Sequence, residues 1–190
     1  MEKTLFPWQY GTWRDVSSMR ARLPHAILLH GPEGIGKTRF AEHFARALLC
    51  EAPSDDGHAC GRCAPCGWFD QYSHPDYRRV RPEALDENEA TEGDAEPAEE
   101  KKTAKSTKAP SKDIRIDQIR ALSDFINIST HRQGMRVVLL HPAEALNGAA
   151  ANALLKMLEE PPPHTVFLLV SNSLDRLLPT KLSRCRKFPL

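Results

Sequence analysis

The chain has 190 residues and a formal net charge of +1 at pH 7. This length suffices for one α/β domain with a hydrophobic core but not for two large domains. The near-zero charge excludes a strong overall field that would attract nucleic acid or membranes, and no apolar run reaches the roughly 18 residues of a membrane span. Because the start of the sequence has no apolar signal core, we expect an intracellular, cytoplasmic protein.

The first expected element is a short helix within residues 6–23, where aromatic and aliphatic side chains recur. We interpret these side chains as packing against the edge of the core. Contact with an adenine ring is the alternative, because the segment precedes the motif described next, but the spacing does not support it.

A glycine-rich motif follows an apolar run at residues 26–30 that predicts a buried strand. Behind the motif, residues 39–49 carry Phe40, Phe44 and Leu48 at four-residue spacing, which predicts an amphipathic helix. The motif itself fits the pattern G-x-x-x-x-G-K-[ST] and reads Gly31-Pro32-Glu33-Gly34-Ile35-Gly36-Lys37-Thr38.

The residue types in this motif suit phosphate binding. Glycines let backbone N–H groups turn toward a phosphate, and the helix N-terminus adds a partial positive charge. Lys37 can reach the β- and γ-phosphates, and the Thr38 hydroxyl can bind Mg²⁺. We therefore predict a P-loop of nucleotide-binding ancestry, with ATP and Mg²⁺ as candidate ligands, rather than a glycine turn that only caps a helix.

Four of the five cysteines are clustered directly after the P-loop helix. Cys50, Cys60, Cys63 and Cys66 form the pattern C-x9-C-x2-C-x2-C, which supplies the four ligands of a tetrahedral zinc ion. With four thiolates such a site is closed and therefore structural. We predict a zinc-binding module at residues 50–66, because disulfides would need an oxidising compartment that nothing else indicates.

The composition changes between residues 83 and 112. The segment begins acidic and turns basic, and it has almost no large apolar side chain. Such a stretch cannot bury enough surface to offset the entropy of ordering. We predict a disordered insertion here, with a lysine-rich tether for nucleic acid or a partner as the alternative.

The remaining elements alternate between strands and helices. Apolar patterning predicts helices at residues 117–126 and 149–158, with Asp117 as the N-cap of the first. The expected strands are residues 135–140, 165–171 and 185–190, and residues 74–81 are expected to form a turn that leads into a further strand. Residues 175–183 are expected to be helical or turn-like. This alternation predicts an α/β fold with a parallel sheet covered on both faces, and ligands then gather at the carboxyl ends of the strands.

The end of the expected strand at 135–140 argues against ATP hydrolysis. A P-loop ATPase needs an acid there to hold magnesium, and many use a second acid to polarise water. His141 and Pro142 occupy these places, and the next carboxylate, Glu144, comes one turn too late. Histidine suits Mg²⁺ poorly because that ion prefers oxygen. We therefore expect slow turnover or none, and the sequence leaves open whether ATP is bound.

Several motifs occur together and resemble those of bacterial clamp-loader subunits, which belong to the AAA+ family. They are the P-loop, the cysteine insertion, His74-Pro75-Asp76, the stretch 152–162 that reads NALLKMLEEPP, and Ser183-Arg184-Cys185. Within the clamp loaders the chain resembles the delta-prime subunits of DNA polymerase III more than the motor subunits gamma and tau. The resemblance covers almost all residues except 83–112.

The resemblance implies an AAA+ P-loop ATPase-like domain over residues 1–190, without the C-terminal lid and collar of the family. It implies a stator-like subunit that works with gamma/tau and delta subunits to load the sliding clamp onto primed DNA in replication. Arg184 would be an arginine finger presented to ATP on the adjacent subunit, and Ser171 a sensor of the γ-phosphate. Such a chain belongs to a nucleotidyltransferase holoenzyme but itself catalyses neither polymerisation nor efficient ATP hydrolysis.

Two other functions compete with this one. An ATP-hydrolysing motor subunit of the gamma/tau type would require the strand-end acids that His141 and Pro142 replace. A zinc-dependent nucleic-acid-binding module would use the cysteine loop and the lysine run, but the near-zero net charge argues against it.

Overall fold

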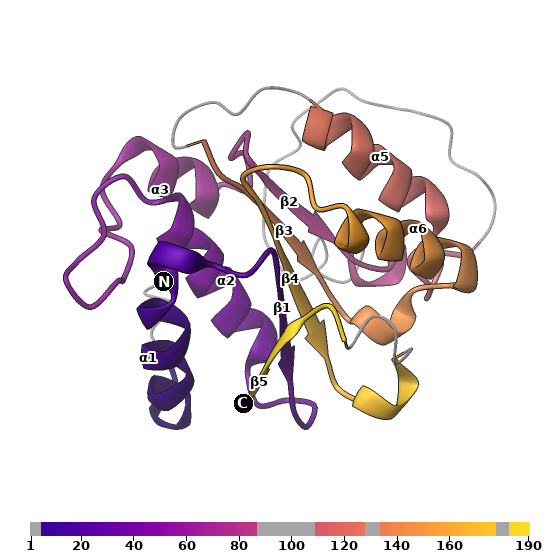
Figure 1. Ribbon diagram of the computed structural model, residues 1–190, viewed down its shortest axis with the longest axis horizontal. Helices are drawn as coiled ribbons and strands as arrows, with labels where there is room; N and C mark the ends of the chain where they lie inside the picture. The colour runs from indigo at the N-terminus through magenta and orange to yellow at the C-terminus, as the bar shows by residue number, and fades with distance from the viewer. Residues whose placement is uncertain (1–4, 87–108, 128–133, 178–182) are drawn as a thin grey trace.

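The structure is a computed structural model that describes residues 5–86, 109–127, 134–177 and 183–190 (Figure 1). Among these residues no helix is both long enough and apolar enough to cross a membrane.

A five-stranded parallel sheet forms the centre of the molecule, with the strand order β2-β3-β4-β1-β5 (Figure 1). Each neighbouring pair runs parallel, so the predicted α/β fold with a parallel sheet is confirmed. The strands are β1 Ala26–His30, β2 Tyr77–Val80, β3 Arg136–Leu140, β4 Thr165–Ser171 and β5 Arg186–Pro189. The central strands β1, β3 and β4 are buried along nearly their whole length, as continuous apolar runs in a two-sided sheet require.

Helices cover both faces of the sheet (Figure 1). One face carries α1 (Tyr10–Ser18), α2 (Lys37–Leu49) and α3 (Ala64–Asp70), and the other carries α5 (Ile116–Asn127) and α6 (Gly148–Glu159). Alternate side chains of one strand enter different cores: Ile27 and Leu29 pack under α2, whereas Leu28 packs with α5 and α6. This alternation is the period of two expected of a strand covered on both sides.

Short 3₁₀ segments complete the fold. They are η1 (Pro7–Gln9), η2 (Arg20–Arg22), η3 (Ala143–Ala145) and η4 (Leu174–Arg176). The helix expected within residues 6–23 is therefore divided into η1, α1 and η2. Of the segment predicted at 175–183, η4 covers the start and residues 178–182 lie outside the described residues.

Two details of the helices differ from the sequence prediction. Asp117, predicted as an N-cap, lies inside the first turn of α5, where its charge still favours the helix N-terminus. Helix α3 was not predicted, because it is only seven residues long and its composition includes proline and glycine. The cap of α6 is Asn147, whose Oδ1 accepts the backbone N–H of Ala150 at 2.8 Å.

Hydrogen bonds join the two described ends of the predicted insertion, residues 83–86 and 109–112. Glu83–Asp86 form a helical turn, and the backbone N–H of Ala84 donates to the carbonyl of Ser111. Glu83 Oε2 also accepts the backbone N–H of Ser111 at 3.2 Å. Residues near both boundaries of the predicted insertion are therefore held by hydrogen bonds to each other. The rest of the predicted insertion, residues 87–108, lies outside the described residues, so the prediction of disorder there stays a prediction.

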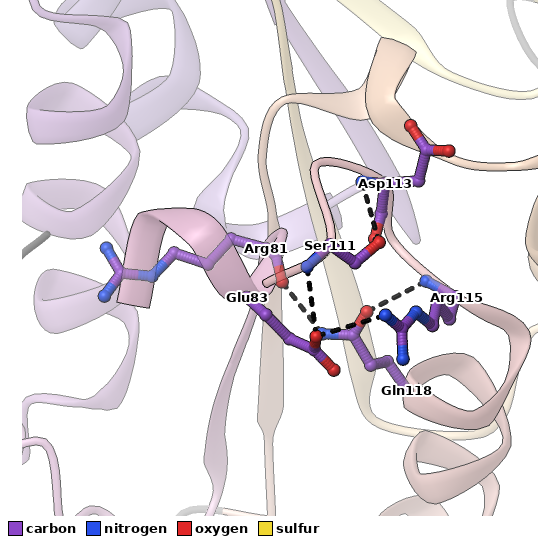
Figure 2. A network of polar contacts seen from close by, with 6 residues as sticks. All are labelled: Arg81, Glu83, Ser111, Asp113, Arg115 and Gln118. Atoms are coloured by element: carbon purple, nitrogen blue, oxygen red, sulfur yellow. Dashed lines mark hydrogen bonds and ion pairs between the residues drawn. The ribbon is translucent and has the colours of Figure 1, made fainter. Parts of the chain in front are cut away.

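Helix α5 joins the same network, as Figure 2 shows. Glu83 pairs with Arg115 at 3.3 Å, while Gln118 donates to the carbonyl of Arg81 at 2.8 Å and accepts the backbone N–H of Arg115 at 2.9 Å. These bonds hold the segment after β2, which includes Leu85, against the start of α5.

Candidate nucleotide-binding site and metal centre

The P-loop connects β1 to α2, as the sequence predicts. His30 ends β1 and Lys37 begins α2. Gly36 has a φ of 83°, and a Cβ there would lie 2.6 Å from the Phe6 ring, so the position needs glycine for both backbone and space. The loop thus keeps the strand–loop–helix geometry that cradles phosphates.

The N-terminal segment packs on the outer side of this loop. The Trp8 indole N–H donates to the carbonyl of Ile35 at 3.2 Å, and Gln9 Nε2 donates to the carbonyls of Ile35 and Gly36 at 3.2 Å. Phe6 and Trp8 stack with ring centroids 4.7 Å apart. The interpretation as packing against the core is confirmed for Trp13 and Val16, which are buried in the first core. The residues before them, Trp8 and Gln9, additionally cover the P-loop. Gln9, a fully buried polar residue, was not singled out from sequence.

A cavity of about 430 Å³ opens beside the P-loop. Its walls come from the P-loop, the ends of β3 and β4, and the turn after β2; they include Lys37, Thr38, Leu85, His141, Pro142 and Asn172. The volume lies within the range of small-molecule sites, roughly 300–1,000 Å³. The carboxyl ends of the strands meet here, as expected for a parallel sheet.

Lys37 is the main cationic group of the cavity. Its ammonium donates a hydrogen bond to the carbonyl of Pro32 within the P-loop. Burial lowers the pKa of Lys37, and the carboxylates of Glu144 and Glu33 oppose that shift. The ammonium is therefore oriented into the loop that would surround a phosphate.

At the carboxyl end of β3, His141 and Pro142 lie beside the cavity as the sequence predicts, but Glu144 is unexpectedly close. His141 and Pro142 line the cavity and offer no carboxylate. Glu144, which the sequence placed too late, lies in η3, and its Oε1 accepts the backbone N–H of Asn172 at 2.9 Å. The turn of η3 brings this carboxylate back to the end of β4, a placement that spacing along the chain does not reveal.

Ser171 and Asn172 differ in their access to the cavity. Ser171 is fully buried, and its hydroxyl donates to the carbonyl of Ser173 at 3.0 Å and accepts the backbone N–H of Ser173 at 3.2 Å. Asn172, and not Ser171, lines the cavity. The sensor role of Ser171 remains a prediction, and the structure adds Asn172 as a polar residue that lines the cavity at this strand end.

The cysteine cluster is assembled as the sequence predicts. The sulfur atoms of Cys50, Cys60, Cys63 and Cys66 all lie within 4.8 Å of one another. Cys50 and Cys63 Sγ are 3.8 Å apart, which is about the edge of a tetrahedron with metal–sulfur bonds near 2.3 Å. The four cysteines are free thiols and are close enough to hold a metal ion.

The surroundings of the cluster favour thiolate formation at Cys60, which is only partly buried. Backbone N–H groups of Arg62 and Cys63 lower the pKa of Cys60 to about 6. Burial raises the pKa of Cys50 and of Cys66, so these two thiols need a cation to ionise readily. The donor set and the spacing therefore fit a soft divalent metal.

Helix α1 anchors the loop that carries these cysteines. The Trp13 indole N–H donates to the carbonyl of Asp56 at 3.0 Å, and its ring stacks on His58 at 4.4 Å between centroids. Arg20 donates to the carbonyl of Gly57 at 3.2 Å. The metal loop is thus attached to the N-terminal helix as well as to α2.

Arg184 lies at the amino ends of the parallel strands, whereas the P-loop lies at their carboxyl ends. Arg186 pairs with Ile27 near the amino end of β1, whereas Pro189 pairs with His30 at its carboxyl end. Arg184 therefore precedes β5 at the amino edge, where its Nη2 contacts Glu159 Oε1 at 2.7 Å. The guanidinium cannot serve the cavity of its own chain. Cys185, which lies next to Arg184, packs against the second core and is not part of the metal cluster.

Comparison with known proteins identifies relatives along almost the whole chain. The model of the family described as DNA polymerase III, delta subunit, matches residues 15–190. The DNA polymerase III subunit delta' of Pseudomonas aeruginosa is 44% identical over 95% of this chain and 47% of its own length. The Escherichia coli subunit delta' is 34% identical over 95% of this chain and 47% of its own length. The chain thus spans about half the length of these relatives.

Solved structures show the same fold at low identity. A gamma subunit-related protein of DNA polymerase III from Thermotoga maritima has a TM-score of 0.59 at 22% identity, covering 94% of this chain and 45% of that one. A Thermotoga maritima RuvB variant has a TM-score of 0.51 at 13% identity, covering 98% and 45%. These likenesses concern the AAA+ fold alone.

Proposed function

Because the chain belongs to the DNA polymerase III delta-prime family, we propose that it is the P-loop domain of a clamp-loader subunit that acts in DNA replication as a stator. It assembles with gamma/tau and delta subunits, and through them acts on the sliding clamp and primed DNA. Its own contribution to catalysis is Arg184, offered to ATP held by a neighbouring subunit.

One observation carries this proposal: Arg184 precedes the amino end of β5, whereas the P-loop follows the carboxyl end of the neighbouring strand β1. A chain arranged in this way can face one neighbour with its arginine and another with its nucleotide site. The guanidinium is half-buried and paired with Glu159 at 2.7 Å. Since a half-exposed ion pair is worth little, Arg184 can exchange Glu159 for the phosphates of a neighbour's ATP.

The nucleotide site of this chain is proposed to bind rather than to hydrolyse. The P-loop supports binding, because Lys37, Thr38 and the cavity are in place. His141 and Pro142 line that cavity where acids would be needed to activate water, and such losses cost orders of magnitude in rate. The motor-subunit alternative is disfavoured by the same two residues.

We further propose that the metal at the cysteine cluster is a structural Zn²⁺ ion. All four ligands are thiolates, so a bound zinc would have no open position for water. Its contribution would be to hold the loop at residues 50–66, and with it the contacts of α1, in one conformation.

The test uses the full chain assembled with its partner subunits. In single-turnover ATP hydrolysis, Arg184→Ala should slow one kinetic phase by about 10³-fold or more, the range known for arginine fingers supplied in trans. Arg186→Ala is the matched control, because Arg186 is an exposed arginine two residues further on and should leave all phases unchanged. If Arg184→Ala behaves like the control, Arg184 is an ordinary surface residue and the proposal fails.

A further inference from the structure

Gln9 is a polar side chain that the fold buries completely. It ends the 3₁₀ segment η1, and its carboxamide contacts the P-loop, but Gln9 is not among the described residues that line the cavity beside that loop. Burying a carboxamide is costly unless its hydrogen bonds are made. The contacts that satisfy Gln9 therefore indicate what the residue does.

Both N–H bonds of this carboxamide end on the P-loop. Gln9 Nε2 donates to the carbonyl of Ile35 and to the carbonyl of Gly36, each at 3.2 Å. Its Oε1 accepts the backbone N–H of Phe6 at 3.1 Å, and the backbone N–H of Gln9 donates to the carbonyl of Phe6 at 2.9 Å. Because a carboxamide has only two N–H donors, its whole donor capacity is used on two consecutive peptide groups of the loop.

The orientation of these two peptide groups matters for a phosphate. In a trans peptide the C=O and N–H bonds point in opposite directions. The carbonyls of Ile35 and Gly36 are directed toward Gln9, so the N–H groups of the same two peptides are directed away from it. Those N–H groups belong to Gly36 and Lys37, which line the cavity and lie at the N-terminus of α2, where backbone N–H groups are free to bind an anion.

Glycines flank the first of these peptides and make it easy to rotate. Gly34 and Gly36 both have a φ of 83°, and glycine adopts positive and negative φ about equally readily. The peptide between Ile35 and Gly36 could therefore turn its carbonyl oxygen toward the cavity at low cost. A concave site binds anions only while successive N–H groups face it, so the loop needs a contact that holds the carbonyl on the other side.

We propose that Gln9 is a positioning residue for the phosphates of a bound nucleotide. It holds the carbonyls of Ile35 and Gly36 away from the cavity, and thereby keeps two backbone N–H groups directed toward the phosphates. Trp8 shares the Ile35 carbonyl at 3.2 Å but is largely exposed, so the buried Gln9 carries most of the effect. This inference rests on nucleotide binding by the P-loop, one part of the function proposed above, and adds to it a residue from outside the motif.

The test is binding of inorganic triphosphate, a probe without an adenine ring, to the isotope-labelled full chain. In the unmodified protein we expect the amide NMR signals of Gly36 and Lys37 to shift downfield when triphosphate binds. Gln9→Met has nearly the same size but cannot donate a hydrogen bond. We expect this variant to bind triphosphate about 10-fold more weakly, the effect of losing one hydrogen bond to a charged group, and to show smaller shifts of the same two signals.

Thr12→Val is the matched control. The Thr12 hydroxyl, in α1, donates to the carbonyl of Pro189 at 3.0 Å, so this variant loses a hydrogen bond of the N-terminal segment without changing a contact to the P-loop. Both variants should lower the melting temperature, but Thr12→Val should bind triphosphate as the unmodified protein does. A purely structural role of Gln9 would make the two variants alike in both measurements.

Three results would overturn the inference. If Gln9→Met binds triphosphate as tightly as Thr12→Val, Gln9 does not position the loop, and nucleotide binding by the P-loop still stands. If triphosphate binds to the unmodified protein without shifting the signals of Gly36 and Lys37, these N–H groups do not face the phosphates; this result needs no variant and decides the question even if Gln9→Met does not fold. If the unmodified protein binds no triphosphate, the proposed nucleotide site fails together with this inference. The Arg184 proposal is measured on the ATP of a neighbouring subunit and is unaffected.

Discussion

Individual residues decide whether this nucleotide site can do chemistry. His141 and Pro142 line the cavity at the strand end where hydrolases carry acids. We predict that His141→Asp combined with Pro142→Glu creates measurable ATP turnover in the chain without its partner subunits, because a magnesium ligand and a water-polarising group are supplied together. Phosphate release from the double variant and the unmodified chain measures the change. Equal turnover in both proteins would contradict the assignment.

The cysteine cluster gives a second prediction at the scale of the residue. Cys63→Ser should lose most of the bound metal, because three thiolates and a hydroxyl no longer form a good zinc site. The melting temperature should fall by about 5 °C or more, since each 1 kcal/mol lost corresponds to roughly 2–4 °C in a chain of this size. Metal analysis and thermal unfolding test both effects.

Cys185→Ser is the matched control for that experiment. Cys185 packs beside the second core and lies outside the cluster, so its replacement should leave the metal content unchanged. A Cys63→Ser protein with unchanged metal content would rule out the four-cysteine site.

Among the elements, the turn after β2 links the insertion to the nucleotide cavity. Glu83 accepts the Ser111 N–H at 3.2 Å and pairs with Arg115 at 3.3 Å, and Leu85 in the same turn lines the cavity. We predict that Glu83→Ala costs about 1 kcal/mol of stability, as expected for half-exposed polar contacts. The variant should also weaken nucleotide binding through Leu85, and chemical denaturation together with nucleotide titration would show both effects.

Replacing residues 88–107 with a short glycine–serine linker is the companion experiment. These residues carry no large apolar side chain, so their removal should leave the free energy of unfolding nearly unchanged. A large drop in the melting temperature would mean that this stretch contributes to the core. Retained stability with lost nucleotide binding would instead place its role at the cavity.

At the scale of the whole molecule, charge separates the proposed function from a nucleic-acid-binding module. The net charge is +1, so the chain lacks the overall field that concentrates DNA at a protein surface. We predict that the isolated chain binds a primed DNA duplex more weakly than about 1 µM at roughly 0.15 M salt. Fluorescence anisotropy over a salt series measures this. Tight binding that falls steeply with salt would favour the module.

The sheet also orders the functional groups across the whole molecule. The P-loop, Glu144 and Asn172 lie at the carboxyl ends of the strands, whereas Arg184, paired with Glu159, lies at their amino ends. Because all five strands are parallel, loops at the carboxyl ends of the strands can contact each other, but the length of the strands separates them from loops at the amino ends. This separation lets a single domain face two neighbours with different chemistry.

The sequence by itself determined the features that depend on short spacing. The P-loop between a buried strand and an amphipathic helix, the four-cysteine pattern and the alternation of strands and helices are all local, and each was found in the structure. Periodicity and motif spacing are sufficient for such features, because neighbouring residues in the chain build them.

Only the tertiary structure decided what lies around the P-loop. The approach of Glu144 to Asn172, the place of Leu85 in the cavity wall and the Arg184–Glu159 pair each join residues far apart in the chain. The order of strands sets these distances, and no local pattern encodes that order. The physical reason is that a parallel sheet brings together the ends of strands that dozens of residues separate in the chain.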